Sequence, residues 1–384
     1  MKFCLAFNGQ GKQDSELFLE FIHSNTEFGE LIKSTNAILG EDIVKIIEDS
    51  ELLNKAKYAQ ISTFVINHCA YLLMKDQYKL SPSVAIGHSL GHYNALVASR
   101  CISYENALKI VKRRAELTEQ IVDQSDGTGM FGISGADIDM NEIMQLCNDL
   151  SDEKRFVGIA IMNTPQNIVL SFYNYHVEEI LDYFGDYRVS IMKVPAPYHS
   201  KAMLSAVPAF MDKLYTIEFK DPTITVISNV TGKPLNKGQI RNDLIQHLIA
   251  PINMYQCVQY FAKIDVTVIL EASLFRVISK IASRNHAYEV YNMIYDIDKF
   301  LKESENKQRE YNVCLEMMGQ LMSIPDIDKY MDIKELKAFY YELKEHKNSN
   351  GKDYKGNPLL YQRYQSIISM NSREAIWQKS RSII

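Results

Sequence analysis

At 384 residues, with 46% hydrophobic and 23% charged residues, the chain has the composition of a folded globular protein and not of a disordered one. Its net charge of −5 argues against nucleic acid as a main partner, because binding phosphates needs a concentrated basic surface. No apolar run approaches the roughly 18 residues of a membrane-spanning helix, so we expect no membrane partner either.

The cysteines indicate the redox environment. All six are scattered and none forms a C-x-x-C pair, so the sequence predicts neither a zinc knuckle nor a disulfide framework. The apolar run at residues 3–7 is too short for a signal peptide and is followed by an Asn-Gly turn. We therefore expect a reduced, cytoplasmic protein.

The first elements in chain order predict an α/β layer. Residues 3–7 fit a buried strand, and a glycine-bearing loop at 8–13 follows it. Helical periodicity runs from residue 15 to about residue 79. A second strand then leads into residue 87, with a helical pattern after it. This succession favours a parallel sheet covered by helices.

Between residues 127 and 194 the expected order of strands and helices changes. We expect a strand at 130–133, a helix at 140–147, a strand pair at 156–172, a helix at 176–184 and a strand at 187–194. This β-α-β-β-α-β order is typical of a ferredoxin-like unit. It predicts a small subdomain inserted in a larger one.

Later segments return to α/β character, with strands expected at 223–228 and 266–270 and tail helices at 311–322 and 333–347. We therefore predict an α/β fold with three parts. These are a large α/β-hydrolase-like subdomain with a parallel sheet (1–126 and 195–300), an inserted ferredoxin-like subdomain (127–194) and a mostly helical C-terminal extension (301–384).

The segment 84–92 predicts a strand that delivers Ser89 into a G-x-S-x-G turn. Gly87 and Gly91 suit such a nucleophile elbow, because the turn is strained and leaves no room for Cβ atoms. Three fixed positions in five recur by chance, so ordinary turn glycines are the alternative. The strand before the turn and the helix after it favour the elbow.

A serine nucleophile needs a base, and histidine is the usual choice because its pKa lies near neutrality. His199 is the strongest candidate, since it follows a predicted strand in a loop that Pro195 and Pro197 hold extended. A hydrogen-bonded loop histidine is the alternative. His88 and His92 adjoin the serine in sequence, but local packing or helix-surface roles are expected for both.

Two backbone N–H donors must meet the charge that develops on the substrate. The elbow offers the N–H of Leu90, and the loop around Gln10 can offer the second, because its flanking glycines permit close approach. A plain turn is the alternative for this loop. A phosphate loop is not, since G-x-x-x-x-G-K-[ST] is absent. No acid stands out for a triad among the aspartates between the serine and the histidine: Asp123, Asp126, Asp137 and Asp182.

Arg113 and Arg114 continue the helical pattern after the elbow. An arginine near the serine suits a substrate that carries a carboxylate, because the guanidinium binds carboxylates through two parallel hydrogen bonds. A solvated helix face is the alternative, and we expect it for Arg113.

Several motifs coincide with one family: the chain resembles the malonyl-CoA:acyl-carrier-protein transacylases, and most of all the freestanding acyltransferases of polyketide synthases. Residues 7–13 resemble the family's opening F-P-G-Q-G-S-Q, residues 87–96 its G-H-S-L-G-E-Y-x-A-L, and residues 197–200 its histidine loop. Arg114 lies 25 residues after Ser89, where family helices carry an arginine. Further similar segments lie at 163–166, 228–231 and 250–252.

The resemblance implies a ping-pong reaction with malonyl-CoA as substrate and with no bound cofactor or metal. Ser89, deprotonated by His199, takes the malonyl group, while the N–H groups of Gln10 and Leu90 hold the oxyanion. Arg114 binds the malonyl carboxylate. The partner is an acyl carrier protein, whose phosphopantetheine thiol then removes the acyl group. Family members orient the histidine with a backbone carbonyl, which accounts for the missing acid.

The resemblance also implies substrate-binding roles around this centre for Gln60, His92, Tyr198, Asn163 and His247. Gln60 is similar to a family glutamine that holds the arginine. His92 replaces a glutamate and His247 a glutamine, and both changes bear on acyl preference. Tyr198 occupies a position where a bulky aromatic residue, in family members, goes with a preference for malonyl over branched extender units. In the tail, residues 312–318 and 324–325 resemble the extension of freestanding acyltransferases.

Three functions fit these observations. The leading one is a discrete malonyltransferase acting in trans for a polyketide or hybrid synthase, with fatty-acid synthesis as its variant. The alternative is an acyl hydrolase that clears carrier proteins, since transfer and hydrolysis differ only in whether thiol or water reaches the acyl-serine. The third is a non-catalytic docking subunit of the same fold. Arg114 argues against the hydrolase, and the intact Ser89 and His199 argue against the docking subunit.

Overall fold

The computed structural model describes residues 2–11, 13–282 and 288–305. Contacts divide the chain into two units, Lys2–Tyr295 and a second one made of Met1 and Asp296–Ile384. Of the second unit the structure describes residues 296–305, which are helical from residue 297. The predicted tail helices at 311–322 and 333–347, and the tail segments 312–318 and 324–325, lie outside the described residues.

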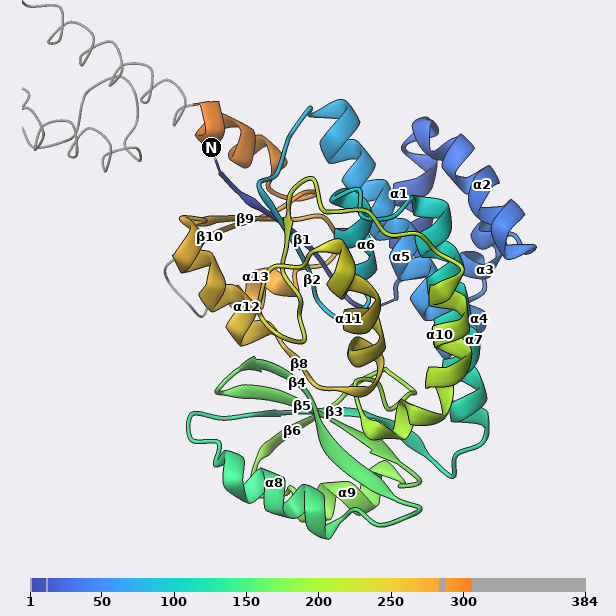
Figure 1. Cartoon of the computed structure of the whole chain (residues 1–384), viewed down its shortest axis with the longest axis vertical. Coiled ribbons are helices and arrows are strands. Elements are labelled where there is room, and N and C mark those ends of the chain that lie inside the picture. Colours follow the sequence, from blue (N-terminus) through green and yellow to red (C-terminus); the bar gives the residue numbers. More distant parts are fainter. Residues whose placement is uncertain (1, 12, 283–287, 306–384) are drawn as a thin grey trace, which may run out of the picture. The chain divides into compact units, whose positions relative to one another are not determined.

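A parallel sheet forms the centre of the larger subdomain (Figure 1), as predicted. Within the described residues its strand order is β10-β9-β1-β2-β7, and all neighbouring pairs are parallel. The strands are β1 (Cys4–Phe7), β2 (Val84–Gly87), β7 (Thr225–Val226), β9 (Val268–Glu271) and β10 (Glu289–Asn292). Phe7 lies opposite Gly87 in the register of β1 and β2, so the loop at 8–11 begins beside the serine turn.

Helices cover the parallel sheet. Helix α6 packs against β1 and β2, while α12 and α13 pack on the face that presents Cys4, Ala6 and Ile86. The helices are α1 (Ser15–His23), α2 (Gly29–Leu39), α3 (Ile43–Glu48), α4 (Ser50–Asn54), α5 (Ala56–Leu72), α6 (Gly91–Ala98), α7 (Tyr104–Asp123), α10 (Val207–Tyr215), α11 (Lys237–Ile249), α12 (Met254–Phe261) and α13 (Ile278–Ala282). Shorter turns are η1 (Thr26–Phe28), η2 (Leu73–Gln77), η3 (Lys201–Ala206) and η4 (Ala262–Ile264).

The smaller subdomain is the green part of Figure 1 and follows the predicted β-α-β-β-α-β order. Its elements are β3 (Thr128–Ser134), α8 (Met140–Asp149), β4 (Phe156–Thr164), β5 (Asn167–Tyr173), α9 (Val177–Tyr183) and β6 (Arg188–Ile191). The antiparallel order β6-β3-β5-β4 is that of a ferredoxin-like sheet. A short strand of the larger subdomain, β8 (Ile252–Asn253), extends it beside β4.

The smaller sheet has a core on each face. Helices α8 and α9 cover one face, around Phe131 and Leu170. The other face, around Met130 and Val169, packs against the segment that contains Val194 and Tyr198. Because this segment is held between the two subdomains, the residue that follows it, His199, has a fixed place.

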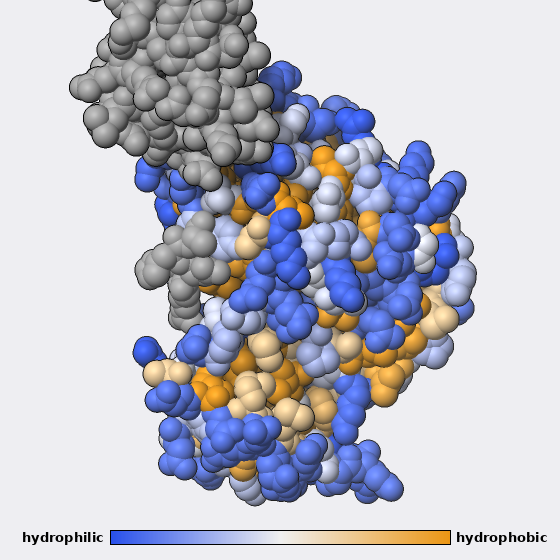
Figure 2. All heavy atoms as spheres, turned by 60° about the vertical axis from the view of Figure 1, so that its left-hand side comes forward, coloured by the Kyte–Doolittle hydropathy of each residue, from blue (hydrophilic) through white to orange (hydrophobic). Residues whose placement is uncertain are grey.

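Hydrophilic residues dominate the face in Figure 2, and hydrophobic ones gather in separate patches, one of them over the smaller subdomain. In the part of the chain that the structure describes, no helix is both long and apolar enough to cross a membrane. The described cysteines, Cys4, Cys69, Cys101, Cys147 and Cys257, are all buried free thiols.

Candidate active site

The serine turn has the geometry of the predicted nucleophile elbow. β2 ends at Gly87 and α6 begins at Gly91, and between them Ser89 has a left-handed φ of 49°. A Cβ on Gly87 would lie 2.0 Å from backbone atoms of Gly91, and one on Gly91 would lie 2.2 Å from the carbonyl oxygen of Phe7. Real Cβ atoms never approach so closely, so both positions require glycine.

Ser89 and His199 form a hydrogen-bonded pair, with Ser89 Oγ 2.6 Å from His199 Nε2. The other ring nitrogen, Nδ1, lies 2.7 Å from the backbone carbonyl oxygen of His247. A carbonyl oxygen only accepts, so Nδ1 carries the proton and Nε2 is free to accept from the serine hydroxyl. The acceptor at Nδ1 is therefore a peptide group and none of the four aspartates considered from the sequence.

Burial controls the charge of His199, whose side chain is fully buried. Desolvation is the largest influence on its pKa, and the nearby positive charge of Arg114 adds to it; together they lower the pKa to about 3. The hydrogen bond to the carbonyl of His247 opposes this shift. The imidazole is thus neutral at physiological pH, which is the state that a general base requires.

Two backbone donors lie at the ends of β1 and β2. The N–H groups of Gln10 and Leu90 donate to no atom within the described residues. Leu90 is fully buried, and the carbonyl oxygen of His88 lies 2.8 Å from the position of a Cβ on Gly9, so the two loops are in close contact. Free N–H groups of this kind suit a developing oxyanion.

Arg114 is the most unusual side chain of the site, because it is only 1% exposed and has no ion-pair partner among the described residues. It comes from α7, where Arg113 on the neighbouring face is half-exposed and pairs with Glu116 at 3.5 Å, as expected for a solvated position. Arg114 Nη1 donates to Gln60 Oε1 from α5, while its Nε donates to nothing.

The ring of Tyr198 completes the surroundings of this guanidinium. Arg114 Cζ lies 4.7 Å from the centre of the Tyr198 ring, within cation–π distance. A buried, positively charged group without a counter-ion is costly unless an anion joins it. The guanidinium of Arg114 is therefore suited to bind a negatively charged group close to the Ser89 and His199 pair.

His92 and His247, the two departures from the family pattern, lie together beside the pair. Their rings are 5.5 Å apart and stacked, and the His247 ring is 4.8 Å from that of His199. Local packing or a helix-surface role is the expectation for His92, and the structure excludes the helix surface, because the side chain is fully buried and Nε2 donates to Asp243 at 2.8 Å. Neither ring nitrogen of His247 has a partner among the described residues.

Two functional neighbours were missed from the sequence. Asp243, on α11, accepts from both His92 and Ser228 and so joins two helices and a strand end. His88, for which local packing or a helix-surface role was expected, donates from Nε2 to Asn163 Oδ1 of β4 at 3.0 Å and joins the two subdomains. Neither contact has a local signal, because the partners are 151 and 75 residues apart in sequence.

The chain is similar to known acyltransferases. The acyl transferase domain family matches residues 5–287. The malonyl CoA-acyl carrier protein transacylase of Bacillus subtilis is 26% identical over 326 residues, which cover 82% of this chain and 80% of that protein. A polyketide biosynthesis protein, ThaF of Burkholderia thailandensis, is 30% identical over 263 residues, covering 67% of this chain and 22% of that protein.

A solved structure shares the fold over its whole length. The acyl-carrier-protein S-malonyltransferase of Burkholderia pseudomallei 1710b has a TM-score of 0.71 and 26% identity, and the match covers 79% of this chain and 100% of that one. The elbow, the family match and this fold agree with the resemblance inferred from the motifs. The chain belongs to the acyl transferase domain family.

Proposed function

We propose that the protein transfers a malonyl group from malonyl-CoA, through an acyl-serine, to the thiol of an acyl carrier protein. The observation that carries the proposal is Arg114, a buried guanidinium without a counter-ion that lies close enough to His199 to lower its pKa. The malonyl carboxylate supplies the missing negative charge. It would bind at the free Nε and the remaining donors of the guanidinium.

In the first half-reaction His199 Nε2 accepts the hydroxyl proton of Ser89 while Oγ attacks the thioester carbonyl. The N–H groups of Gln10 and Leu90 donate to the resulting oxyanion. Collapse of the tetrahedral intermediate breaks the carbon–sulfur bond, and the proton on Nε2 passes to the departing CoA sulfur. The products are malonyl-Ser89 and free CoA, and His199 is neutral again.

In the second half-reaction His199 takes the proton of the incoming phosphopantetheine thiol, and the thiolate attacks the malonyl-serine ester. The same two N–H groups meet the oxyanion. When the carbon–oxygen bond breaks, Nε2 returns the proton to Ser89 Oγ. No step needs a resident cofactor or metal, and the phosphopantetheine arrives on the carrier protein.

Arg114 also links the pKa of His199 to substrate binding. Its positive charge is one cause of the low pKa of His199 in the empty site. A bound malonyl carboxylate neutralises this effect, so the pKa of His199 rises and the imidazole becomes a better base once substrate is in place. The substrate's own charge thereby helps to activate the nucleophile.

The names of the relatives support the choice of substrates and partner, since the similar proteins include a malonyl CoA-acyl carrier protein transacylase and an acyl-carrier-protein S-malonyltransferase. The similarity to a polyketide biosynthesis protein supports action in trans for a polyketide or hybrid synthase. A cytoplasmic location forms part of the proposal and is supported by the free thiols of the described cysteines. Carrier hydrolysis is not favoured, because simple acyl chains leave Arg114 unpaired.

The test is to incubate the protein with malonyl-CoA or acetyl-CoA and a holo acyl carrier protein and to measure the carrier by intact mass. We expect malonyl loading, and none with Ser89→Ala. Arg114→Ala should lower malonyl loading at least about 30-fold, because truncating one side of a buried charged contact costs about 2 kcal/mol or more. Acetyl loading should change much less.

Arg113→Ala is the matched control, since it removes the same charge one residue away at a half-exposed position, and it should leave malonyl loading unchanged. Malonyl transfer that survives Ser89→Ala would refute the mechanism. Hydrolysis of acetyl-carrier without any malonyl loading would favour the hydrolase.

A further inference from the structure

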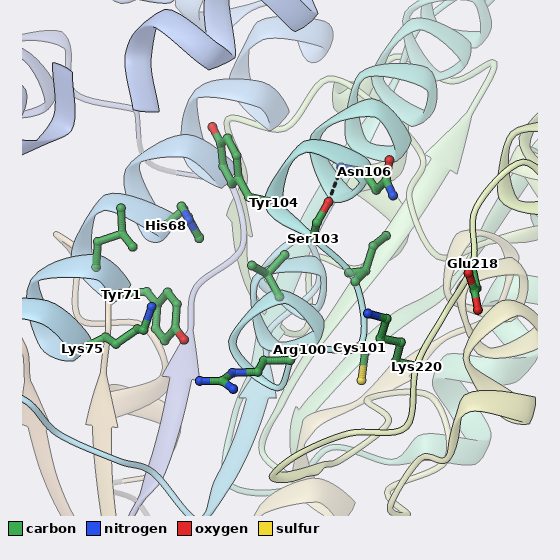
Figure 3. A pocket seen from close by; sticks show the side chains of 13 residues that line it. His68, Tyr71, Lys75, Arg100, Cys101, Ser103, Tyr104, Asn106, Glu218 and Lys220 are labelled. Carbon is green, nitrogen blue, oxygen red and sulfur yellow. Dashed lines mark hydrogen bonds between the residues drawn. The ribbon is translucent and has the colours of Figure 1, made fainter. Parts of the chain in front are cut away.

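A cavity with a volume of about 500 Å³ lies at the end of α6 that is remote from Ser89 (Figure 3). It is lined by the end of α5 with η2, by the turn between α6 and α7, and by residues around Glu218 and Lys220. None of the active-site residues lines it. Helix α6 separates it from the serine by about 12 Å, the length of eight helical residues.

The lining carries an excess of positive charge, with Lys75, Arg100 and Lys220 against one carboxylate, Glu218. Arg100 and Lys220 form no ion pair within the described residues, whereas Lys75 pairs with the exposed Asp76 at 3.8 Å. The backbone N–H of Lys220 donates to the carbonyl of Cys101 at 2.9 Å, which places Lys220 beside the chain segment of Arg100. Arg100 and Lys220 are therefore available to an anion.

A helix also begins at this cavity. Ser103 caps α7 by accepting from the N–H of Asn106 at 3.2 Å, and Ser103, Tyr104 and Asn106 all line the space. The first turn of a helix of 20 residues carries partial positive charge and favours an anion. The start of α7 and the positively charged side chains thus both favour an anionic ligand.

An unpartnered buried side chain, His68, gives the independent indication of a ligand. Its side chain lines the cavity, is only 6% exposed, and leaves Nδ1 without a hydrogen-bond partner. Burial, with a smaller effect of Lys75, lowers its pKa to about 3, so the ring is neutral and offers one donor and one acceptor. Figure 3 shows the ring between Tyr71 and Tyr104. The centre of the His68 ring is 5.6 Å from that of Tyr71 and 4.3 Å from that of Tyr104.

The backbone around the cavity is irregular. α5 continues as a π-helical turn, η2, which carries Lys75, and π-helical turns in proteins occur frequently at functional sites. Arg100 has a left-handed φ of 60°, which turns the chain sharply between α6 and α7. Both features bring a cation to the wall of the cavity.

From these contacts we propose that the cavity binds a small phosphate monoester with a ring-bearing, polar body. The phosphate lies against Arg100, Lys220 and the first turn of α7. The body lies against Tyr71 and His68, where the imidazole meets one of its hydrogen-bonding groups. The site is separate from acyl transfer and does not rest on the proposed function.

The experiment is isothermal titration calorimetry of the full chain with adenosine 5′-monophosphate, inorganic phosphate and adenosine as probes. We expect adenosine 5′-monophosphate to bind with a Kd below about 1 mM and at least about tenfold more tightly than either fragment, since both halves of the site are then occupied. An equal Kd for the nucleotide and for inorganic phosphate would refute the part of the proposal that gives the ligand a ring-bearing body. No binding of any probe at about 1 mM would overturn the site.

Variants locate the binding. The double variant Arg100→Asn with Lys220→Gln should weaken nucleotide binding at least about tenfold, and asparagine tolerates the left-handed φ at position 100. His68→Phe should weaken the nucleotide and leave inorganic phosphate unchanged. Lys109→Gln, on an exposed face of α7 outside the cavity, is the matched control. Binding that persists in the double variant lies elsewhere and overturns the proposal, and an unchanged midpoint of thermal unfolding verifies that the variants are folded.

Discussion

His199 donates from Nδ1 to the backbone carbonyl of His247 across 2.7 Å, so a peptide group holds the orientation that a carboxylate holds in a serine triad. A substitution at position 247 changes the side chain and leaves this acceptor in place. The imidazole of His247, although its ring is 4.8 Å from that of His199, is not required for the proton transfers proposed above.

We therefore expect His247→Gln to keep kcat/KM for malonyl transfer within about tenfold of the parent, because the carbonyl that orients His199 is retained. The measurement is steady-state transfer to a holo carrier protein. His199→Ala is the reference for a lost base and should lose about a thousandfold or more. A loss of that size in His247→Gln would mean that the imidazole itself takes part.

The pH dependence should reveal the low pKa of His199. The base acts in its neutral form, and desolvation with help from Arg114 lowers its pKa to about 3. The acidic limb of kcat/KM, which reports the free enzyme, should therefore lie well below the ordinary histidine pKa of about 6.5.

Arg114→Met should move that limb to higher pH, because removing a positive neighbour favours the protonated imidazole. Acetyl-CoA is the substrate for both enzymes, since it does not need the arginine. An acidic limb at the same pH in both would contradict the charge coupling between the two residues.

Asp243 should contribute strongly to stability, because it accepts from His92 and Ser228 in the buried interior. Asp243→Ala leaves both donors without a partner, and we expect it to lower the free energy of unfolding by about 2–4 kcal/mol. Urea denaturation measures the change. Asp212→Ala, at an exposed position of α10, should stay within about 0.5 kcal/mol and serves as the comparison.

Gly91→Ala should prevent the elbow from forming, because the new Cβ would lie 2.2 Å from the carbonyl oxygen of Phe7. We expect insoluble protein or the loss of malonyl loading, measured on purified material. Gly29→Ala tests the same change where no heavy atom lies within 4 Å and where α2 begins, and it should fold normally. Full activity in Gly91→Ala would mean that β1 can move aside.

The sequence predicted the features that depend on local pattern. The G-x-S-x-G turn, the parallel sheet and the β-α-β-β-α-β order all follow from periodicity and glycine spacing, which act over a few residues. The strand expected at 223–228 is shorter, spanning Thr225–Val226, because its end turns away into an isolated bridge between Ile227 and Pro234. Boundaries of this kind depend on neighbours that the sequence does not name.

The residues alone indicated one contact between distant segments, that of Ser89 with His199 110 residues away, but not the partners of Arg114 and His92. Periodicity marked Arg114 as helical, but its burial depends on α5 supplying Gln60 as a hydrogen-bond acceptor 54 residues away. The residues around His92 do not indicate its partner, Asp243, which comes from α11 and lies 151 residues away in sequence. Such pairs arise only when the fold brings the helices together.

Both members of the Ser89 and His199 pair have left-handed backbone, with φ of 49° and 57°. Residues other than glycine and asparagine rarely adopt this backbone conformation. Each one that does lowers the free energy of unfolding by about 1–2 kcal/mol. Natural selection for acyl transfer and selection for folding therefore act in opposite directions at both positions. In a related protein that no longer needs acyl transfer, glycine or asparagine should replace these two residues early. Relatives that keep both serine and histidine should therefore still catalyse acyl transfer.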